Sequence, residues 1–226
     1  MILALGATAP EDSRAGASTG RAGRFDGEPV VEFSADIVTR DADGTQLGAI
    51  GKLHVAGHKV RIDAPDTPGG FYLVDPDAGT ALFIRPAQRV FTNAGQSSLL
   101  TQIFVPVNPD DPCPQWEAAA RLAGEAFPDG IEPCVREQPG PGKSGATPTY
   151  RVNIPYRQNS QRRVDPDLRF PVSAQSADGT RITLEQIRLE AQPVSLFTLP
   201  ADYARFDPRD LLERIRHSDA WVEPPE

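Results

Sequence analysis

The chain has 226 residues and a net charge of −8, and 39% of its residues are hydrophobic. This composition predicts a folded core and excludes a fully disordered chain. The acidic balance argues against nucleic acid as a partner, because phosphate backbones are bound by clustered lysine and arginine. It also gives no sign of attraction to anionic membrane surfaces. The 23 prolines and 19 glycines favour many turns and a β-rich fold.

Residues 1–28 are expected to be a disordered leader or the remnant of a signal peptide. The stretch Met1–Ala9 is apolar and ends in small residues at A-x-A spacing, which is typical of the end of a secretory signal. An ordinary chain terminus fits the same residues. Residues 10–27 are rich in glycine, alanine, serine and charge, which predicts disorder. No apolar run approaches the roughly 18 residues of a membrane-spanning helix, so we expect no integral membrane protein.

Six short strands are predicted in the first half of the chain. Apolar and polar residues alternate from Val31 to Ile37, the period of two that marks a half-buried strand. The later strand-like runs are 47–55, 59–63, 71–74, 80–85 and 89–92, separated by glycine, proline and aspartate. Connections this short join antiparallel neighbours, so the runs predict a meander.

The segment 113–134 between the two cysteines is expected to be a helical insertion packed on the concave face of the sheet. Pro114 suits a first helical turn, and the residues that follow it are rich in alanine and glutamate. Trp116 and Ala120 would face the sheet, together with Ala123 or Gly124. The apolar run 99–105 fits a helix or a strand equally well.

The β pattern returns after residue 149 and ends in an apolar closing segment. Strand-like runs cover 164–172 and 181–190, joined by the turn 177–180. Residues 207–226 are expected to form a C-terminal helix and tail. Two β domains split near the cysteine segment are the alternative, but neither half alone has enough strands to cover a core, so we expect residues 29–206 to form a single domain. Its predicted class is mainly β (α+β), with a strongly curved antiparallel sheet, an incomplete β-barrel of about ten strands.

Cys113 and Cys134 are the two cysteines of the chain, and they close a loop of about 22 residues. A metal pair, a redox pair and two free thiols are the alternatives to a disulfide. No C-x-x-C spacing occurs and no histidine lies near either cysteine, so we expect a structural disulfide. Such a bridge would stabilise the fold by about 3 kcal/mol and implies an oxidising compartment.

Catalytic and metal-binding motifs are missing from the sequence. His54 and His58 flank a predicted hairpin turn at Ala56-Gly57, which would pair Val55 with His58 and place the two imidazoles on opposite faces of the sheet. There is no G-x-S-x-G elbow, no G-x-G-x-x-G and no P-loop. We therefore expect no metal, no cofactor and no enzymatic activity.

Aromatic residues in the predicted strands are candidates for the wall of a ligand cavity. Core packing is the commoner role of such residues. In an unclosed barrel the two roles merge, because inward side chains line whatever space remains. The expected cavity-lining residues are Phe33, Leu53, Ile62, Leu73, Phe83 and Phe91.

The order of these segments resembles a known family. It runs from the strand Val31–Asp36 through Gly51–Asp63 and the Pro-interrupted run Leu82–Phe91. It continues through Val164-Asp165-Pro166 and closes on Pro193-x-x-Leu196-Phe197-x-Leu199-Pro200-x-x-Tyr203. This pattern is similar to the bacterial outer-membrane lipoprotein-sorting (LolA-like) superfamily, especially its uncharacterised periplasmic branch. The resemblance covers residues 29–206 and brings no catalytic residues with it.

The resemblance implies an incomplete antiparallel barrel with a helical lid over an apolar cavity that accepts acyl chains. The expected function is that of a periplasmic or secreted, non-enzymatic protein of the bacterial cell envelope. Its expected partner is a hydrophobic small molecule or a lipidated protein. The alternative is a protein-interaction or sensor module of the envelope, with a filled core and no ligand.

Overall fold

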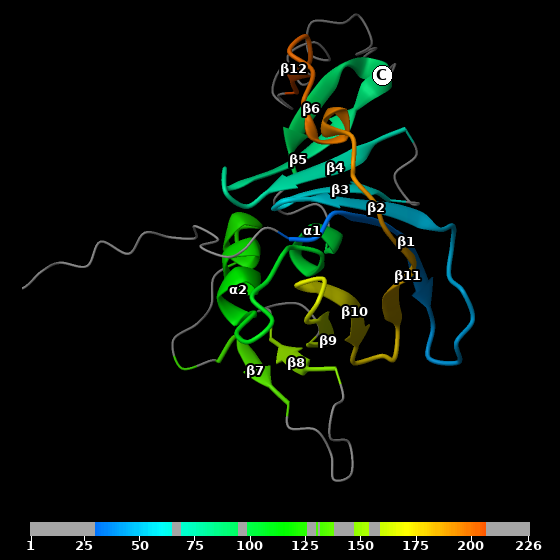
Figure 1. Ribbon diagram of the computed structural model, residues 1–226, viewed down its shortest axis with the longest axis vertical. Coiled ribbons are helices and arrows are strands. Elements are labelled where there is room, and N and C mark those ends of the chain that lie inside the picture. Colours follow the sequence, from blue (N-terminus) through cyan, green and yellow to red (C-terminus); the bar gives the residue numbers. More distant parts are fainter. Residues whose placement is uncertain are drawn as a thin grey trace, which may run out of the picture.

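A computed structural model describes residues 30–64, 69–94, 99–125, 130, 132–137, 147–153 and 159–206. The expected leader 1–28 and the expected C-terminal helix and tail 207–226 lie outside the described residues. The described chain forms one twelve-stranded sheet with helices on one side of it (Figure 1). The mainly β class and the curved, unclosed sheet are confirmed.

The elements follow the chain in a simple order. The strands are β1 Phe33–Arg40, β2 Gly51–Ala56, β3 Lys59–Asp63, β4 Phe71–Asp75, β5 Thr80–Arg85, β6 Val90–Asn93, β7 Cys134–Arg136, β8 Thr149–Val152, β9 Ser160–Asp165, β10 Phe170–Ser176, β11 Arg181–Leu189 and β12 Ala204–Arg205. The helices are α1 Leu100–Ile103 and α2 Cys113–Leu122, with 3₁₀ turns η1 Pro86–Gln88 and η2 Val194–Phe197.

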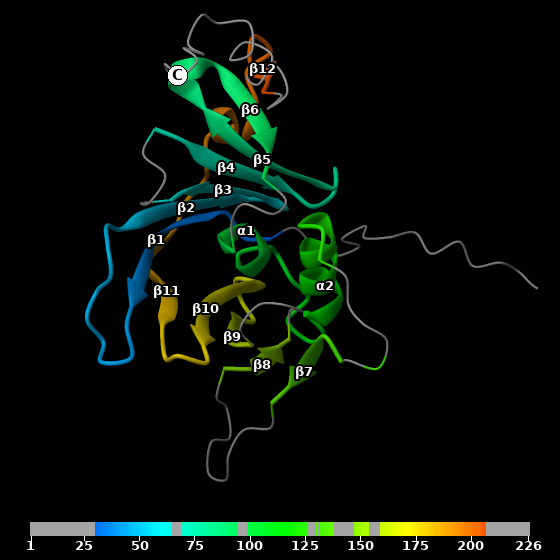
Figure 2. The same cartoon turned by 180° about the vertical axis from the view of Figure 1, so that it is seen from behind.

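The sheet consists of two meanders, β1–β6 and β7–β11. The long-range pairing of β1 with β11 joins them. The strand order is β12-β6-β5-β4-β3-β2-β1-β11-β10-β9-β8-β7. The described pairings are antiparallel except for β12 with β6. Strands β12 and β7 end the order without pairing with each other, so the sheet is an open half-barrel (Figures 1 and 2).

The strand register shifts at two places in the sheet, once between β1 and β11 and once between β9 and β10. The β1–β11 register shifts between Ser34 and Asp36, opposite Gln186, whose φ is +51°. The β9–β10 register shifts between Pro171 and Ser173. An extra residue in one strand bends that strand and increases its twist. The bulges therefore help to curve the sheet around its concave face.

The main core lies between the concave face and the helices. The rings of Phe33 and Phe170 meet edge to face at 5.3 Å, and Phe104, just after α1, stacks on Phe170 at 6.3 Å. From α2, Trp116 packs against the Tyr150 ring at 5.8 Å. Burial of such rings contributes about 1.5–3 kcal/mol each. Helix α2 thus sits on the concave face, as the sequence predicts for the insertion 113–134.

A smaller apolar cluster lies on the convex face of the β1–β6 meander. Phe71, Leu73 and Ile84 form it. Leu199 and Tyr203 pack over them from the apolar closing segment, residues 193–203. The Arg61 guanidinium lies 3.7 Å from the centroid of the Phe71 ring. The closing segment therefore docks on the outside of the sheet, opposite the helices.

Two local predictions differ from the structure, and one alternative that the sequence left open is decided. The β2–β3 turn is Gly57-His58, so Val55 pairs with Val60 and the predicted register was wrong by two positions. Gly57 has φ +57°, which suits the first position of a tight hairpin turn. The ambiguous run 99–105 forms α1, and the run 47–55 becomes a strand only from Gly51.

Candidate functional site

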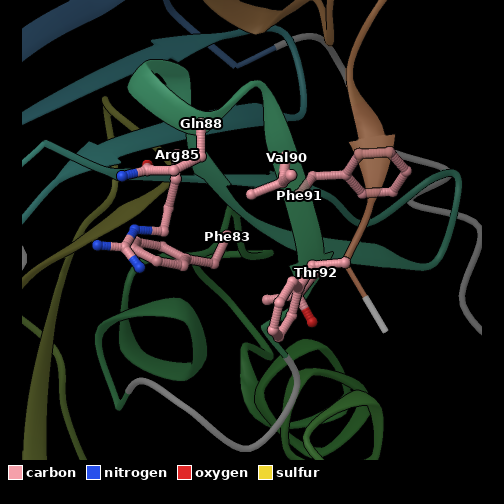
Figure 3. Close-up of a pocket in the computed structure, with 7 residues that line it drawn as sticks. Phe83, Arg85, Gln88, Val90, Phe91 and Thr92 are labelled. Atoms are coloured by element: carbon pink, nitrogen blue, oxygen red, sulfur yellow. The ribbon is translucent and has the colours of Figure 1, made fainter. Parts of the chain in front are cut away.

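An open hollow of about 480 Å³ lies at the β5–β6 end of the sheet (Figure 3). We call it the β5–β6 hollow. Its walls carry three aromatic rings and one valine, with three polar side chains among them. The lining residues are Phe83, Arg85, Gln88, Val90, Phe91, Thr92 and Phe206.

Strand register explains why most of these side chains meet. Phe83 pairs with Thr92, and Arg85 pairs with Val90. Directly opposite residues share a face of a sheet, and so do residues two apart in one strand. These four side chains therefore project together from the concave face of β5 and β6. Phe206 is held beside them by its backbone N–H, which donates to the Phe91 carbonyl at 2.7 Å.

Gly70 lies against the Phe83 ring, which is one wall of the hollow. It precedes β4, and the Phe83 ring lies over it. A Cβ atom at residue 70 would stand 2.4 Å from Cζ of Phe83, closer than any normal carbon contact. The ring occupies its present place only because residue 70 has no side chain.

Charge at the hollow is confined to its rim. Arg85 and Gln88 are exposed, and Arg85 forms no ion pair with any residue that the structure describes. An apolar wall with a cation at its edge suits an amphipathic ligand whose anionic end stays near water. A volume of about 480 Å³ leaves room for several methylene groups beside the rings.

The six residues predicted to line a cavity fall into three groups. Phe83 and Phe91 line the β5–β6 hollow. Phe33, Leu53 and Ile62 are completely buried in the core under the helices. Their proposed role as cavity wall stays a prediction.

Leu73 points to the opposite side of the sheet from the three buried core residues. It pairs with Leu82, whereas its neighbour Tyr72 pairs with Phe83 on the concave face. It belongs to the convex cluster with Ile84. Phe91 pairs with Ile84 and also packs on that cluster, although it reaches the hollow. The period of two along a strand separates these residues, and an apolar composition alone does not reveal it.

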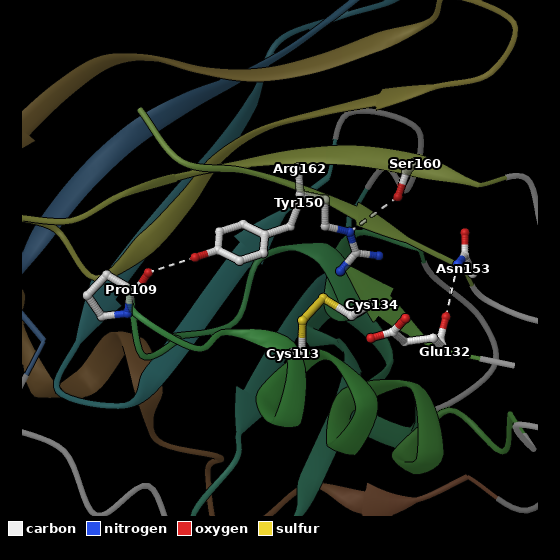
Figure 4. Close-up of a disulfide and its surroundings, with 8 residues drawn as sticks. All are labelled: Pro109, Cys113, Glu132, Cys134, Tyr150, Asn153, Ser160 and Arg162. Carbon is white, nitrogen blue, oxygen red and sulfur yellow. Dashed lines mark hydrogen bonds between the residues drawn. A yellow bond between two sulfur atoms is a disulfide. The ribbon is translucent and has the colours of Figure 1, made fainter. Parts of the chain in front are cut away.

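The predicted disulfide is present and ties α2 to the sheet (Figure 4). Cys113 begins α2 and Cys134 begins β7, with a Cα–Cα distance of 5.4 Å. Beside it, the Tyr150 hydroxyl donates to the Pro109 carbonyl at 3.0 Å. The bridge therefore anchors the insertion at the end of the sheet that β7 and β8 form.

A fully buried arginine, which the sequence pattern did not single out, lies next to this bridge. Arg162 of β9 donates from Nη1 to the Gln102 carbonyl at 3.0 Å and lies 5.0 Å from the Trp116 ring centroid. Its Nη2 has no hydrogen-bond partner among the described residues. Burial lowers the pKa of Arg162 to about 9, because a charged guanidinium is poorly solvated there.

The histidines contact separate partners. His54 Nδ1 lies 2.8 Å from Gln192 Oε1, and His58 Nδ1 lies 2.9 Å from Asp77 Oδ2. Within the described ranges, no group of three or more histidine, cysteine, aspartate or glutamate side chains is placed to hold a metal ion. None of the helices in the same ranges is long and apolar enough to cross a membrane.

Comparison with known proteins finds similarity to solved structures, MucB among them. No protein family matches the sequence, and no curated protein matches it either. The crystal structure of MucB in complex with MucA(peri) is similar to this chain, with a TM-score of 0.35 and 12% sequence identity. The similarity covers 76% of this chain and 55% of the MucB chain, so the chain spans about half the length of that protein.

Proposed function

We propose that this chain is a non-enzymatic protein of the bacterial cell envelope that binds a hydrophobic ligand in the β5–β6 hollow. The observation that carries the proposal is the hollow itself, with about 480 Å³ of space against Phe83, Val90 and Phe91. Small-molecule sites typically measure roughly 300–1,000 Å³ and are lined mainly by apolar and aromatic side chains. The hollow meets both conditions.

An acyl chain is the ligand that suits this lining best. Each methylene that leaves water contributes about 0.8 kcal/mol, so a few buried carbons give measurable binding. A carboxylate or phosphate at the end of the chain would find the Arg85 guanidinium at the rim. A free fatty acid, a lipid or the lipidated end of a protein all present this combination. The resemblance to LolA-like carriers implies the same ligand class.

In this proposal, the disulfide is the main reason to place the protein outside the cytoplasm. Cys113 and Cys134 are bonded, and disulfides persist in oxidising compartments such as the bacterial periplasm. The A-x-A spacing near residue 9 supports export as well. We infer a periplasmic or secreted protein.

The second candidate function is a protein-interaction or sensor module with a filled core. One observation favours it: Phe33, Leu53 and Ile62 are packed under α1 and α2, with no exposed surface. The part of the concave face that these residues occupy is already filled by the chain itself. In that case the hollow at β5 and β6 would stay empty or hold water.

A matched pair of tryptophan variants tests the ligand proposal. Thr92→Trp fills the hollow, whereas Thr80→Trp places the same side chain at an exposed position of β5 outside it. We expect a fluorescent fatty-acid probe to bind the wild type and Thr80→Trp alike, and to bind Thr92→Trp at least about tenfold more weakly. Native mass spectrometry of the purified protein would identify any lipid that is carried along.

Absence of probe binding to the wild type, with the disulfide intact and the fold unchanged, would reject the ligand proposal. The interaction module would then be the better description. Equal binding to wild type and Thr92→Trp would place the ligand elsewhere and reject the assignment to this hollow.

A further inference from the structure

A second, smaller hollow lies on the convex face of the β7–β11 meander. It measures about 180 Å³ and opens over β8, β9, β10 and β11, which run side by side in Figure 2. We call it the β9–β10 hollow. Its lining residues are Thr149, Gln161, Arg162, Arg163, Ser173, Gln175 and Arg181. None of them takes part in the hydrophobic site proposed above.

Strand register gathers the polar side chains into two adjacent rows. In the first row, Arg163 lies opposite Thr149 on one side and Ser173 on the other. In the second row, Gln175 lies between Gln161 and Arg181. Opposite residues share a face, so both rows project from the convex side. Arg162 lies between the rows in sequence, but its guanidinium reaches Gln102 on the concave side.

The hollow carries positive charge that the described residues leave uncompensated. Neither Arg163 nor Arg181 forms an ion pair in the part of the chain that the structure describes. Arg181 donates to the Gln175 amide oxygen at 3.0 Å. The nearby Glu137 carboxylate accepts from Gln161 Nε2 at 3.2 Å. Arg163 and Arg181 thus both line this hollow on a chain whose net charge is −8.

The other side chains of the hollow include hydrogen-bond donors, which an oxyanion requires. Ser173 is 8% exposed and carries a hydroxyl, and the Thr149 hydroxyl lies in the same row. Because Gln175 uses its oxygen to accept from Arg181, its amide nitrogen remains as a donor. Two guanidinium groups, two hydroxyls and one amide can surround a tetrahedral anion from several directions.

The hollow is large enough for a small anion. A space of about 180 Å³ accommodates one small oxyanion together with some of its waters. We propose that the β9–β10 hollow binds a single phosphate or sulfate group, with Arg163 and Arg181 as its charged ligands.

Titration with inorganic phosphate tests the proposal directly. We expect saturable shifts of the backbone amide signals of Thr149, Ser173 and Gln175 in a two-dimensional NMR spectrum, with chloride at equal ionic strength as the reference. Arg163→Gln and Arg181→Gln should each weaken binding by about tenfold or more, because each removes a charge-assisted hydrogen bond. Arg151→Gln is the matched control, since Arg151 is exposed on the same face, opposite Gln161, but does not line the hollow. It should bind as the wild type does.

A second arm identifies the source of the phosphate group. Vesicles of phosphatidylglycerol are compared with vesicles of phosphatidylcholine in a flotation assay. Binding to inorganic phosphate without preference for phosphatidylglycerol supports the site and assigns it a soluble anion. Preference for phosphatidylglycerol that Arg163→Gln and Arg181→Gln abolish supports the site and assigns it a lipid headgroup.

Three outcomes would overturn the proposal. The first is the absence of both saturable phosphate binding and vesicle preference in the folded wild type. The second is unchanged binding in Arg163→Gln and Arg181→Gln. The third is an equal loss in Arg151→Gln, which would reveal a diffuse basic surface in place of a site. Circular dichroism of each variant checks that it is folded before its binding is judged.

Discussion

Gly70 makes the space in which the Phe83 ring lies, and any side chain at residue 70 would collide with that ring. The Cβ of an alanine would stand 2.4 Å from Cζ and 2.7 Å from Cε2 of Phe83. The same ring forms a wall of the β5–β6 hollow. One missing methyl group therefore links the packing of β4 on β5 to the shape of the proposed binding site.

Gly70→Ala should reduce both stability and probe binding. The Phe83 ring must move, and overpacking of this kind costs about 1–3 kcal/mol. We expect a lower urea midpoint and a weaker affinity for the fatty-acid probe. The double variant Gly70→Ala/Phe83→Leu makes room for the new methyl group and should recover most of the stability. A Gly70→Ala protein with wild-type stability and affinity would contradict this close packing.

Arg162→Met should leave the protein as stable as the wild type at neutral pH, or more stable by up to about 3 kcal/mol. The guanidinium is buried with one nitrogen unpartnered among the described residues, and a buried charge of this kind is costly. The lost hydrogen bonds to the Gln102 carbonyl and the Ser160 hydroxyl each offset about 1 kcal/mol of the gain. Urea denaturation of both proteins measures the difference.

The advantage of Arg162→Met should shrink as the pH rises above about 9. Below this pH, Arg162 is charged in the folded and the unfolded chain, so the burial cost is fully present. Above it, the folded chain releases a proton that the unfolded chain still keeps, because the pKa of Arg162 is lowered only in the folded chain, and the wild type gains stability. A strongly destabilised Arg162→Met protein at neutral pH would show that a compensating group holds the guanidinium.

Removal of the disulfide should cost about 3 kcal/mol by the loop-entropy estimate for a sequence separation of 21. The variant is Cys113→Ala/Cys134→Ala, and its free energy of unfolding is compared with that of the wild type under oxidising conditions. Wild type treated with a thiol reductant should lose a similar amount. A double variant as stable as the oxidised wild type would show that the bridge contributes nothing to the fold.

Tyr150→Phe should lower stability by about 1 kcal/mol at neutral pH, because the hydroxyl no longer donates to the Pro109 carbonyl. Burial raises the pKa of Tyr150 above its ordinary value of 10.0. The folded chain therefore keeps this proton longer than the unfolded chain does. The resulting stability is present below pH 10 and lost as the pH rises through the folded pKa.

The tyrosinate absorbance of the folded protein measures this shift. Tyr150 should titrate late in the wild type, and that late component should be missing in Tyr150→Phe. Its persistence in the variant would assign the late titration to another tyrosine.

The sequence predicted the strands of the meander β1–β6 because strand-like runs, some alternating as in β1 and some continuously apolar as in β4, lie between short turns. It did not predict the β12 strand, whose two residues pair with β6 only because the closing segment docks there. Pairing between such distant segments leaves no mark in local periodicity. Leu73 shows a different limit for the site, because the whole run Phe71–Val74 is apolar and buried and so does not indicate which face Leu73 takes.

Arg162 was missed because a charged residue in a strand is normally assigned to the exposed face. A signal was present in its neighbour two residues later. Val164 is apolar and completely buried, and residues two apart in a strand share a face. The alternation through Arg163 therefore places Arg162 inward, against its chemical type.

The pairing of β1 with β11 has a consequence for how the chain reaches its native state. Arg40 and Glu185, which bond across this pair, are 145 residues apart in sequence. Until residues 181–189 have been made and delivered, β1 presents an unpaired edge on which another chain could pair. Contacts between residues so far apart form slowly, because the entropy of closing a long loop is lost before the contacts contribute any stability. A chaperone that covers the β1 edge would therefore keep the unfinished sheet from pairing with another chain.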